Sequence, residues 1–245
     1  MFYETRDNKH GLRHDPFKAL AVPRPIGWIS TIDRNGVCNL APYSFFNAIG
    51  ERPHYVMFSS AGPKDSLLNI ADTQEFVCSL ATWDLRFNMN MTSAAVPRGV
   101  DEFPIGDLTA AASRLVKPPR VKESPAAFEC RHWQTIDLPA AGPHDKSSYS
   151  IIIGQVVGIH IDDRFVKDGM VDTGAMRPIA RLGYMDYAVV TPETVFSIER
   201  PSAEAAMAKL KAPDEAKWGL ANAHTEAGKN RTYGQAGRPP AGEEG

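Results

Sequence analysis

Several short stretches of the chain alternate between hydrophobic and polar residues, which is the pattern of strands that bury one face. Asn35-Gly36 separates the first two stretches, and this pair favours a tight hairpin because both residues tolerate positive φ. Pro42 near the end of the second stretch indicates a sheet edge or a bulge, since proline has no N–H to donate. The predicted strands are residues 25–32, 37–43, 54–60, 76–82, 127–133 and 149–161.

The last of these stretches is the longest and is rich in Ile and Val. Gly154 and Gly158 interrupt it, and glycines inside a strand favour the bends that barrels need. Hairpins at this spacing, with few helices between them, predict a mainly β fold with flanking helices, in the form of a closed or nearly closed antiparallel barrel. A doubly wound sheet is disfavoured because the regularly alternating helices that it requires are missing.

Helical spacing occurs in four places. Pro63 and Asp65 are typical of a helix start, and apolar positions at helical spacing extend that helix over residues 63–71. A second short helix is expected to begin at Asp84, and a third near residues 109–114, inside a long excursion punctuated by glycine and proline. Residues 202–211 are alanine-rich and predict a fourth helix.

The composition shifts after residue 200, which predicts two parts. Residues 1–200 are expected to form the barrel domain, and residues 201–245 a helical C-terminal extension. The last twelve positions, 234–245, consist largely of Gly, Pro and Glu and predict a disordered tail.

Charge and composition narrow the classes of partner. The chain of 245 residues holds 27 Lys and Arg against 29 Asp and Glu, without a long basic run, so neither nucleic acid nor a membrane surface is an expected partner. Three widely spaced cysteines, Cys38, Cys78 and Cys130, form no CxxC pair and predict reduced thiols in strands rather than a metal site. With no apolar leader or membrane-spanning stretch in the sequence, a cytoplasmic protein is expected.

Polar groups cluster at the start of the predicted helix 63–71. The first backbone N–H groups of a helix lack intrahelical partners and carry partial positive charge, so a phosphate could bind there. Further donors would be the hydroxyls of Ser59, Ser60 and Ser66 and the ammonium group of Lys64. A capped surface helix with a solvated lysine is the alternative.

A second polar cluster surrounds Pro42. The proline interrupts the strand and is expected to free the backbone groups of Ala41, Tyr43 and Ser44 beside aromatic side chains. Such a surface suits a planar heterocycle that takes hydrogen bonds at its edge and stacks on its face, as an isoalloxazine ring does. The alternative is that these aromatic residues belong to the core.

Taken together, three phrases resemble the flavin reductase-like, FMN-binding split-barrel family of flavoprotein oxygenase-like proteins. They are Arg-Pro-Ile-Gly-Trp-Ile-Ser-Thr at 24–31, Asn-Leu-Ala-Pro-Tyr-Ser-Phe-Phe-Asn at 39–47 and Lys-Asp-Ser-Leu-Leu-Asn-Ile at 64–70. Weaker matches follow in the same order at 76–80, 90–93, 101–103, 117–121, 123–125 and 180–183. Each motif alone is weak, whereas the ordered set, covering roughly residues 16–190, is specific.

The resemblance implies a six-stranded Greek-key barrel that forms a homodimer, with FMN in a cleft between the subunits. Ser30 and Thr31 would lie along the flavin, and Trp28 would either stack on it or belong to the core. The implied ring and ribityl contacts are Asn39, Ala41, Pro42, Tyr43 and Ser44, and the implied phosphate contacts are Ser59, Ser60, Lys64 and Ser66. Asn90 and Thr92 would contact the flavin from the partner side.

A flavin carries out hydride and electron transfer itself, so the protein needs no acid–base pair of its own. NAD(P)H is the expected co-substrate, and it could dock on the exposed ring face without a Rossmann fold. No catalytic residue is certain; His144 is the candidate for a titratable group near the substrate. The candidate substrate contacts are Arg177, Arg181 and Tyr184, with a dimer salt bridge as the alternative role of Arg181.

Three functions remain in competition. The leading hypothesis is an FMN-dependent oxidoreductase that oxidises NAD(P)H and passes electrons to flavin, oxygen or a small organic substrate. The second is an oxygenase-like enzyme acting on a small aromatic or heterocyclic substrate, favoured by the long excursion at 97–119. The third is a non-catalytic FMN electron carrier.

Overall fold

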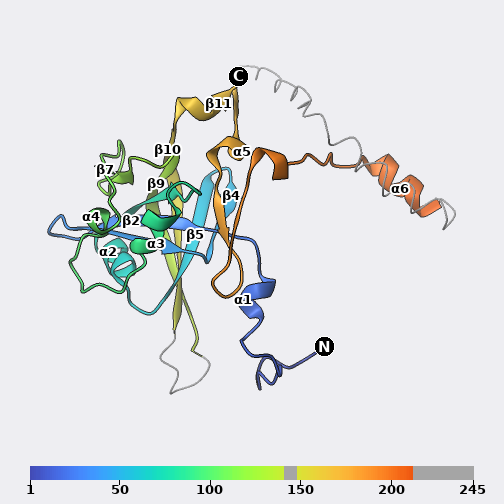
Figure 1. Cartoon of the computed structure of the whole chain (residues 1–245), viewed down its shortest axis with the longest axis horizontal. Coiled ribbons are helices and arrows are strands. Elements are labelled where there is room, and N and C mark those ends of the chain that lie inside the picture. The colour runs from blue at the N-terminus through green and yellow to red at the C-terminus, as the bar shows by residue number, and fades with distance from the viewer. Residues whose placement is uncertain (141–147, 212–245) are drawn as a thin grey trace, which may run out of the picture. The chain divides into compact units, whose positions relative to one another are not determined.

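The computed structural model describes residues 1–140 and 148–211, and its contacts divide the chain after Pro192. The first unit is built on a seven-stranded antiparallel sheet with the order β3-β2-β6-β9-β10-β5-β4 (Figure 1). Its strands are β2 (Gly27–Ile32), β3 (Cys38–Tyr43), β4 (Phe46–Glu51), β5 (His54–Ala61), β6 (Glu75–Leu80), β9 (Ala126–Leu138) and β10 (Tyr149–Ile161).

The predicted fold class is confirmed, because the structure is mainly β, its main sheet is antiparallel throughout, and short helices flank it. Each of the six predicted stretches forms a strand of this sheet, and β4 adds a seventh. The alternation of hydrophobic and polar residues does not predict β4, because none of its residues is buried and its sequence ends in Ile-Gly-Glu. β4 pairs with β5 on the far edge from β3.

The proline and the glycines that interrupt the predicted strands lie at a sheet edge and at irregularities of the strand pairing. Pro42 lies in β3, at the edge of the sheet, where its missing N–H removes no ladder bond to a further strand. The register of β10 against β9 shifts at Gly154 and between Val156 and Gly158. At Gly154 a Cβ would collide with the ring of Phe76, so the bend also permits close packing in the core.

Short strands complete the first unit. β1 (Arg24–Pro25), β13 (Ile179–Arg181) and β14 (Tyr187–Val189) form a three-stranded antiparallel sheet. Two further pairs are β7 (Ala110–Ala111) with β8 (Arg120–Val121), and β11 (Val166–Lys167) with β12 (Met170–Val171). The first sheet matters for the site because it joins the segment before β2 to a hairpin more than 150 residues later.

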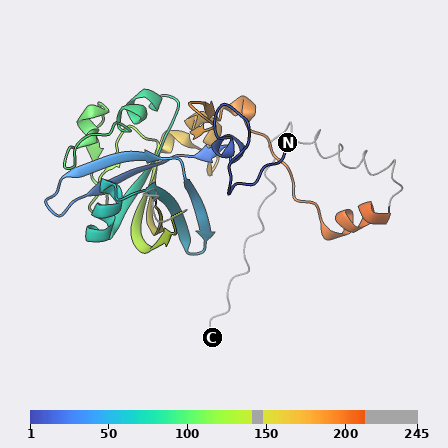
Figure 2. The same cartoon turned by 90° about the horizontal axis from the view of Figure 1, so that it is seen from below.

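Three helices gather around the hairpin of β2 and β3 (Figures 1 and 2). They are α2 (Asp65–Thr73), α3 (Arg86–Met91) and α4 (Glu102–Ile105), and each contacts β3. The predicted helices at 63–71 and after Asp84 correspond to α2 and α3. Two other helical segments, α1 (Phe17–Leu20) and α5 (Thr173–Met176), and the 3₁₀ turns η1 (Asp163–Phe165) and η2 (Pro192–Thr194) are short.

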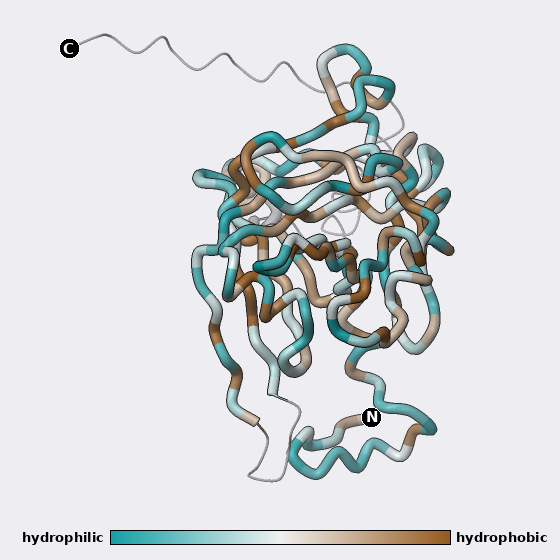
Figure 3. The backbone as a smooth tube through the Cα atoms, turned by 90° about the vertical axis from the view of Figure 1, so that its left-hand side faces the viewer, coloured by the Kyte–Doolittle hydropathy of each residue, from teal (hydrophilic) through white to brown (hydrophobic). Residues whose placement is uncertain are grey.

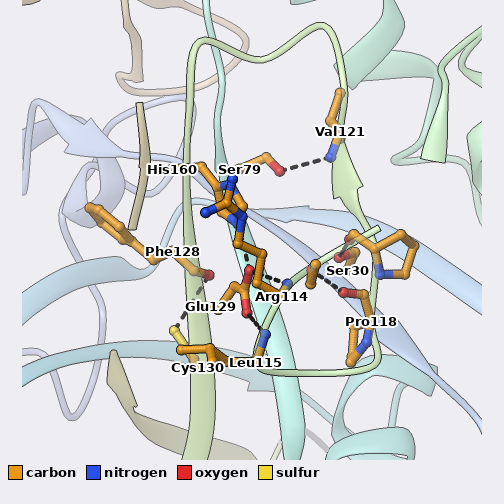
Figure 4. Close-up of polar contacts among 12 residues, drawn as sticks. Ser30, Ser79, Arg114, Leu115, Pro118, Val121, Phe128, Glu129, Cys130 and His160 are labelled. Carbon is orange, nitrogen blue, oxygen red and sulfur yellow. Dashed lines mark hydrogen bonds and ion pairs between the residues drawn. The ribbon is translucent and has the colours of Figure 1, made fainter. Parts of the chain in front are cut away.

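The helix predicted near residues 109–114 is wrong. Ala110 and Ala111 form β7, and the chain after them is held against the barrel by side chains that accept its backbone N–H groups. The buried carboxylate of Glu129 accepts from Arg114 N at 2.7 Å and from Leu115 N at 2.6 Å (Figure 4). These non-local bonds replace the i to i−4 bonds of a helix.

Further contacts fix the same excursion to the sheet. Ser79 Oγ accepts from Val121 N at 3.1 Å, and Ser30 Oγ donates to the carbonyl of Pro119 (Figure 4). His160 Nε2 lies 2.5 Å from Glu129 Oε1. His160 is therefore a structural partner of the carboxylate that binds the excursion, and it is not an isolated base. The excursion is therefore an ordered wall of the barrel.

The core has two main clusters, on the two sides of β2. One contains Phe58, Phe76 and Ile152, and the other contains Trp28, Leu40 and Phe103. Hydrophobic stretches lie within the strands in Figure 3, whereas the N-terminal segment is hydrophilic for most of its length. The three cysteines are unpaired strand residues as predicted; Cys78 and Cys130 are buried and Cys38 is partly exposed.

In the second unit, α6 (Ala203–Lys211) confirms the helix predicted at 202–211. The predicted disordered tail at 234–245 lies outside the described residues. Among the described helices, none has both the length and the apolar character needed to cross a membrane. The described residues also contain no group of three His, Cys, Asp or Glu side chains placed to hold a metal ion.

Candidate functional site

The candidate site is a run of three pockets beside β3, α3 and the β13–β14 hairpin. The first, here called the α2 pocket, has a volume of about 460 Å³, within the usual range for small-molecule sites. It is bounded by β3, the start of α2, the segment after α3 and the start of α4. Its lining residues are Asn39, Ala41, Pro42, Tyr43, Lys64, Asp65, Ser66, Thr92, Ser93, Ala94, Ala95, Val96, Arg98 and Glu102.

The start of α2 supplies the cationic end of this pocket. Lys64 is the N-cap residue and makes no side-chain cap, so the first N–H groups of the nine-residue helix receive no capping side chain. Ser66, in the first turn, is buried and accepts a hydrogen bond from Asn39 Nδ2 at 2.9 Å. Lys64, Ser66 and the free helix end together form a donor set suited to a phosphate.

Tyr43 gives an independent indication that this pocket takes a polar ligand. Its side chain lines the pocket and is 6% exposed, and its hydroxyl lies close to the hydroxyls of Ser60 and Ser66 without forming a hydrogen bond of regular geometry. Burial is the main cause that raises the pKa of this phenol, so it stays a protonated donor. A buried donor without a partner is unfavourable, and a ligand oxygen in the pocket would satisfy it.

The pocket also contains two carboxylates. Asp65 forms an ion pair with Arg98 at 3.6 Å, which balances one of the cations. Glu102 is buried and its Oε2 accepts from Leu40 N at 2.8 Å. Desolvation raises the pKa of Glu102 despite that bond, so burial opposes its charged form.

The contact of Leu40 with Glu102 shows which backbone groups of β3 face the pocket. Leu40 N points away from β2, and alternate residues of a strand direct their amides to opposite edges. The amides of Ala41 and Tyr43 therefore face β2, contrary to the prediction that Pro42 would free them. Pro42 and Ser44 are the next positions on the outer edge.

The second pocket, here called the arginine pocket, adjoins the first through Pro42 and Ser93. It has a volume of about 360 Å³ and lies between the end of β3, α3 and the β13–β14 hairpin. Its lining residues are Lys18, Arg24, Ile26, Pro42, Ser44, Asn90, Ser93, Arg181, Leu182, Tyr184, Met185 and Tyr187.

The third pocket, here called the tryptophan pocket, adjoins the arginine pocket through Asn90 and Tyr187. Its volume is about 350 Å³, and Trp83, Phe87 and Ile179 make much of its wall. Arg86 stacks between Trp83 and Phe87, with its guanidinium carbon 3.9 Å and 4.4 Å from the two ring centroids.

The structure brings most of the predicted cofactor residues together. Those that line the α2 pocket or the arginine pocket are Asn39, Ala41, Pro42, Tyr43, Ser44, Lys64, Ser66, Asn90 and Thr92. Asn90 and Thr92 reach these pockets within a single chain. Arg181 and Tyr184, predicted as substrate contacts, line the arginine pocket.

Three predicted flavin contacts lie behind the pocket wall instead. Trp28, Ser30 and Thr31 are fully buried and bonded within the protein. Trp28 Nε1 donates to Thr92 Oγ1 at 2.9 Å, and Thr31 Oγ1 accepts from Asn69 at 3.1 Å. Of the three, only Trp28 bonds to a residue that lines one of the three pockets, because Ser30 bonds to Pro119 and Thr31 to Asn69. Direct contact of these side chains with a flavin stays a prediction.

Ser59 and Ser60 line none of the three pockets. Ser60 is buried and its hydroxyl donates to the carbonyl of Gly62 at 3.2 Å. Arg177 also lies outside the lining and pairs with Asp84 at 3.3 Å. His144 falls outside the described residues.

Sequence reasoning missed Lys18, Arg24 and Arg98 as members of the site. Arg24 opens the phrase at 24–31, but only its pairing with Arg181 across β1 and β13 reveals its place. Arg98 follows the proline that begins the long excursion, and a single arginine there carries no sequence signal of its place in the pocket. No periodicity points to residues of this kind, because tertiary contacts bring them together.

Comparisons with known proteins agree with this geometry. An uncharacterized protein of Aquifex aeolicus is 36% identical over 170 residues, covering 67% of this chain and 83% of that protein. The crystal structure of nitrilotriacetate monooxygenase component B from Bacillus cereus is similar with a TM-score of 0.70 and 27% identity, covering 82% of this chain and 98% of that one. A split-barrel protein of Shewanella frigidimarina gives a TM-score of 0.67 at 24% identity, covering 82% and 94% of the two chains.

The family model described as the flavin reductase like domain matches residues 19–180, which contain the whole lining of the α2 pocket. Lys18 and the β13–β14 hairpin from Arg181 onward, which line the other two pockets, lie outside the matched residues. On this match and the shared split-barrel fold, the chain belongs to the flavin reductase-like domain family.

Proposed function

We propose that this protein is an FMN-dependent oxidoreductase that oxidises NAD(P)H and passes the electrons to an acceptor. The observation that carries the proposal is the α2 pocket, where Lys64, Ser66 and the unpartnered hydroxyl of Tyr43 converge. Bound FMN would supply the hydride and electron chemistry. The residues of the chain have to bind it, orient it and keep its surroundings dry.

The proposed orientation follows the order of the pockets. Lys64, Ser66 and the free end of α2 would hold the phosphate, and Tyr43 would donate its hydroxyl to the same end of the ligand. Asn39 is already oriented by its bond to Ser66, and it would reach the ribityl chain. The ring would then lie along Pro42 and Ser44, towards the arginine pocket.

The edge of β3 suits a flat ring. Pro42 presents no N–H, and the N–H of Leu40 is occupied by Glu102, so this part of the strand edge offers few donors that would hold water. Trp28 fixes Thr92 from behind, which keeps the opposite wall in position. A homodimer and a cytoplasmic location remain parts of the proposal.

A second candidate is an oxygenase-like enzyme for a small aromatic or heterocyclic substrate. The tryptophan pocket favours it, because it adds about 350 Å³ bounded by aromatic side chains next to the proposed ring position. A reductase that only exchanges electrons with NAD(P)H and free flavin has no need of this extra apolar volume. An FMN electron carrier has no need of it either.

The proposal is tested by the absorption spectrum of the purified protein, before and after NADH or NADPH is added without oxygen. A flavin spectrum that bleaches with either nucleotide supports the oxidoreductase. A flavin spectrum that stays oxidised favours the substrate-specific enzyme or the carrier. If no flavin binds even after incubation with FMN, the proposal fails.

A further inference from the structure

We infer that the arginine pocket binds a small aromatic carboxylate, and that Arg24 and Arg181 give the pocket its preference for an anion. The aromatic carboxylate would be the substrate of the proposed oxidoreductase, and only its role as a substrate rests on that proposed function. The anion preference itself follows from the charges and contacts of the pocket.

Two arginines face each other in this pocket. Arg24 on β1 lies directly opposite Arg181 on β13 in the register of the two antiparallel strands. Like charges in opposite positions destabilise a strand pair. Burial and the charge of Arg181 both lower the pKa of Arg24, which is the effect expected of a cation beside another cation.

Arg24 is held in place without being neutralised. Its Nη1 donates to the carbonyls of Lys18 at 2.5 Å and Ala21 at 2.7 Å, and its Nη2 donates to the carbonyl of Leu182 at 2.7 Å. These acceptors carry no net charge, and Arg24 forms no ion pair among the described residues. The guanidinium is therefore fixed in orientation while its charge remains unbalanced.

One donor of Arg24 has no partner at all. The side chain is 9% exposed and lines the pocket, and its Nε is buried without a hydrogen-bond acceptor among the described residues. A buried donor of a charged group that has no acceptor is unfavourable, and an anion in the pocket would supply both the missing acceptor and a counter-charge. None of the residues that line the pocket is acidic, and Lys18 adds a third cation.

The other walls suit an aromatic ring of modest size. Tyr187 lies under Arg181, with the guanidinium carbon 4.5 Å from the ring centroid, and Ile26 and Met185 add apolar surface. Tyr184 stands at φ 54°, a left-handed conformation that is unusual for a bulky residue, and its side chain lines the same pocket. The volume of about 360 Å³ is at the lower end for small-molecule sites.

The test compares two probes of nearly equal shape, benzoate and its neutral isostere benzamide. Their binding is measured by isothermal titration calorimetry on the full chain, with and without added FMN. Benzoate should bind at least ~10-fold more tightly, because only the charged carboxylate forms charge-assisted hydrogen bonds with the two guanidinium groups. Arg181→Gln should abolish this preference, whereas Arg164→Gln, at an exposed arginine paired with Asp162, should retain it.

Arg24→Gln is the second variant, and it should also abolish the preference where circular dichroism shows that it folds. Equal affinity for the two probes in the unchanged protein would overturn the inference. A second result would also overturn it. In that result, NADPH binds about tenfold more tightly than NADH, the difference disappears in Arg181→Gln, and benzoate does not compete with NADPH. In that case the anion would be a nucleotide phosphate.

The two proposals fail separately. A protein that prefers benzoate but binds no FMN would contradict the proposed function and retain the anion site. A protein that binds FMN but does not distinguish benzoate from benzamide would do the reverse.

Discussion

The α2 pocket and the arginine pocket meet at Pro42 and Ser93, but they balance their charges in different ways. In the α2 pocket, Arg98 has Asp65 as a counter-ion, and a buried carboxyl group, Glu102, lies in the same wall. In the arginine pocket, Arg24 and Arg181 form no ion pair among the described residues and contact neutral carbonyl oxygens and the rings of Phe45 and Tyr187.

The charge balance of each pocket determines how much it gains when an anion binds. A pocket with its own acidic residues is partly compensated before a ligand binds, so the gain from one more anion depends on the shape and donors of the site. A pocket of uncompensated cations gains most from any anion that fits, because the anion removes an existing penalty. We therefore expect the α2 pocket to select its ligand by geometry and the arginine pocket by charge.

Removal of the charge of Lys64 should have the largest effect on the α2 pocket. Lys64→Ala is expected to weaken FMN binding by about 1.5–3 kcal/mol, or roughly 10- to 100-fold, because one charge-assisted contact to the phosphate is lost. Fluorescence titration of the flavin measures this change. The barrel should keep its stability, since the side chain of Lys64 is exposed.

Lys167→Ala, at an exposed lysine in β11, is the matched control and should leave FMN affinity unchanged. Unchanged affinity in Lys64→Ala would contradict the phosphate position. A parallel loss of benzoate binding in Lys64→Ala would contradict the separation of the two pockets.

Tyr43→Phe should produce two effects of opposite sign. Without FMN, the variant should be as stable as the unchanged protein or more stable by about 1 kcal/mol, because a buried hydroxyl without a partner is removed. With FMN, binding should weaken by about 1 kcal/mol, because the ligand loses that donor. Thermal unfolding with and without FMN measures both.

Tyr55→Phe serves as the control, at a half-buried tyrosine outside the three pockets. It should change neither quantity by a comparable amount. A Tyr43→Phe protein that is clearly less stable without FMN would mean that the hydroxyl already has a partner.

The α2 pocket could be predicted from the sequence largely because its signals are local. Pro63 and Asp65 mark a helix start, and Lys64 and Ser66 are adjacent to it, so two donors of the pocket and the helix end lie within four consecutive residues. Alternation along the chain likewise predicted the strands that carry Asn39 and Tyr43. Local patterns of this kind survive folding because neighbouring residues stay together.

The arginine pocket could not be predicted as a unit, because it depends on pairing across the chain. Arg24 and Arg181 are brought together by a two-residue strand, which is too short to leave a periodic pattern. The wrong helix at 109–114 has a similar cause, since its alanine-rich sequence favours a helix until Glu129 binds the following N–H groups. In both places a contact distant in sequence overrides the local preference.

Trp28→Phe tests whether the wall behind the α2 pocket contributes to binding. The change removes the bond from Trp28 Nε1 to Thr92 Oγ1 and part of a fully buried ring, so the free energy of unfolding should fall by more than the ~1 kcal/mol that the bond contributes. FMN binding should weaken to a smaller extent, because Thr92 loses its fixed orientation. Chemical denaturation and flavin titration on the same sample separate the two effects. Equal FMN affinity would mean that Thr92 contributes no contact.

Glu102→Gln should have the smallest effect on FMN binding. Its effect on the free energy of unfolding should depend on pH. Burial raises the folded-state pKa of Glu102, so its contribution to stability is full below the unfolded pKa and is lost as the pH rises through the folded pKa. The variant should therefore match the unchanged protein at acidic pH and become the more stable of the two towards neutral pH.

Glu129 provides the contrast, because hydrogen bonds from Arg114 and Leu115 and the contact with His160 outweigh desolvation and lower its pKa. Its contribution is present above the unfolded pKa and is lost as the pH falls through the folded pKa, so Glu129→Gln should be less stable at neutral pH and approach the unchanged protein in acid.

For the pocket itself, Glu102→Gln should tighten FMN binding roughly twofold to fivefold, or ~0.4–1 kcal/mol, as one carboxylate near the phosphate is neutralised. It should leave benzoate affinity as it is, because Glu102 does not line the arginine pocket. Thermal unfolding from acidic to neutral pH and the two titrations measure these effects, and a weaker affinity for FMN would show that Glu102 acts as an acceptor for the ligand rather than as a repelling charge.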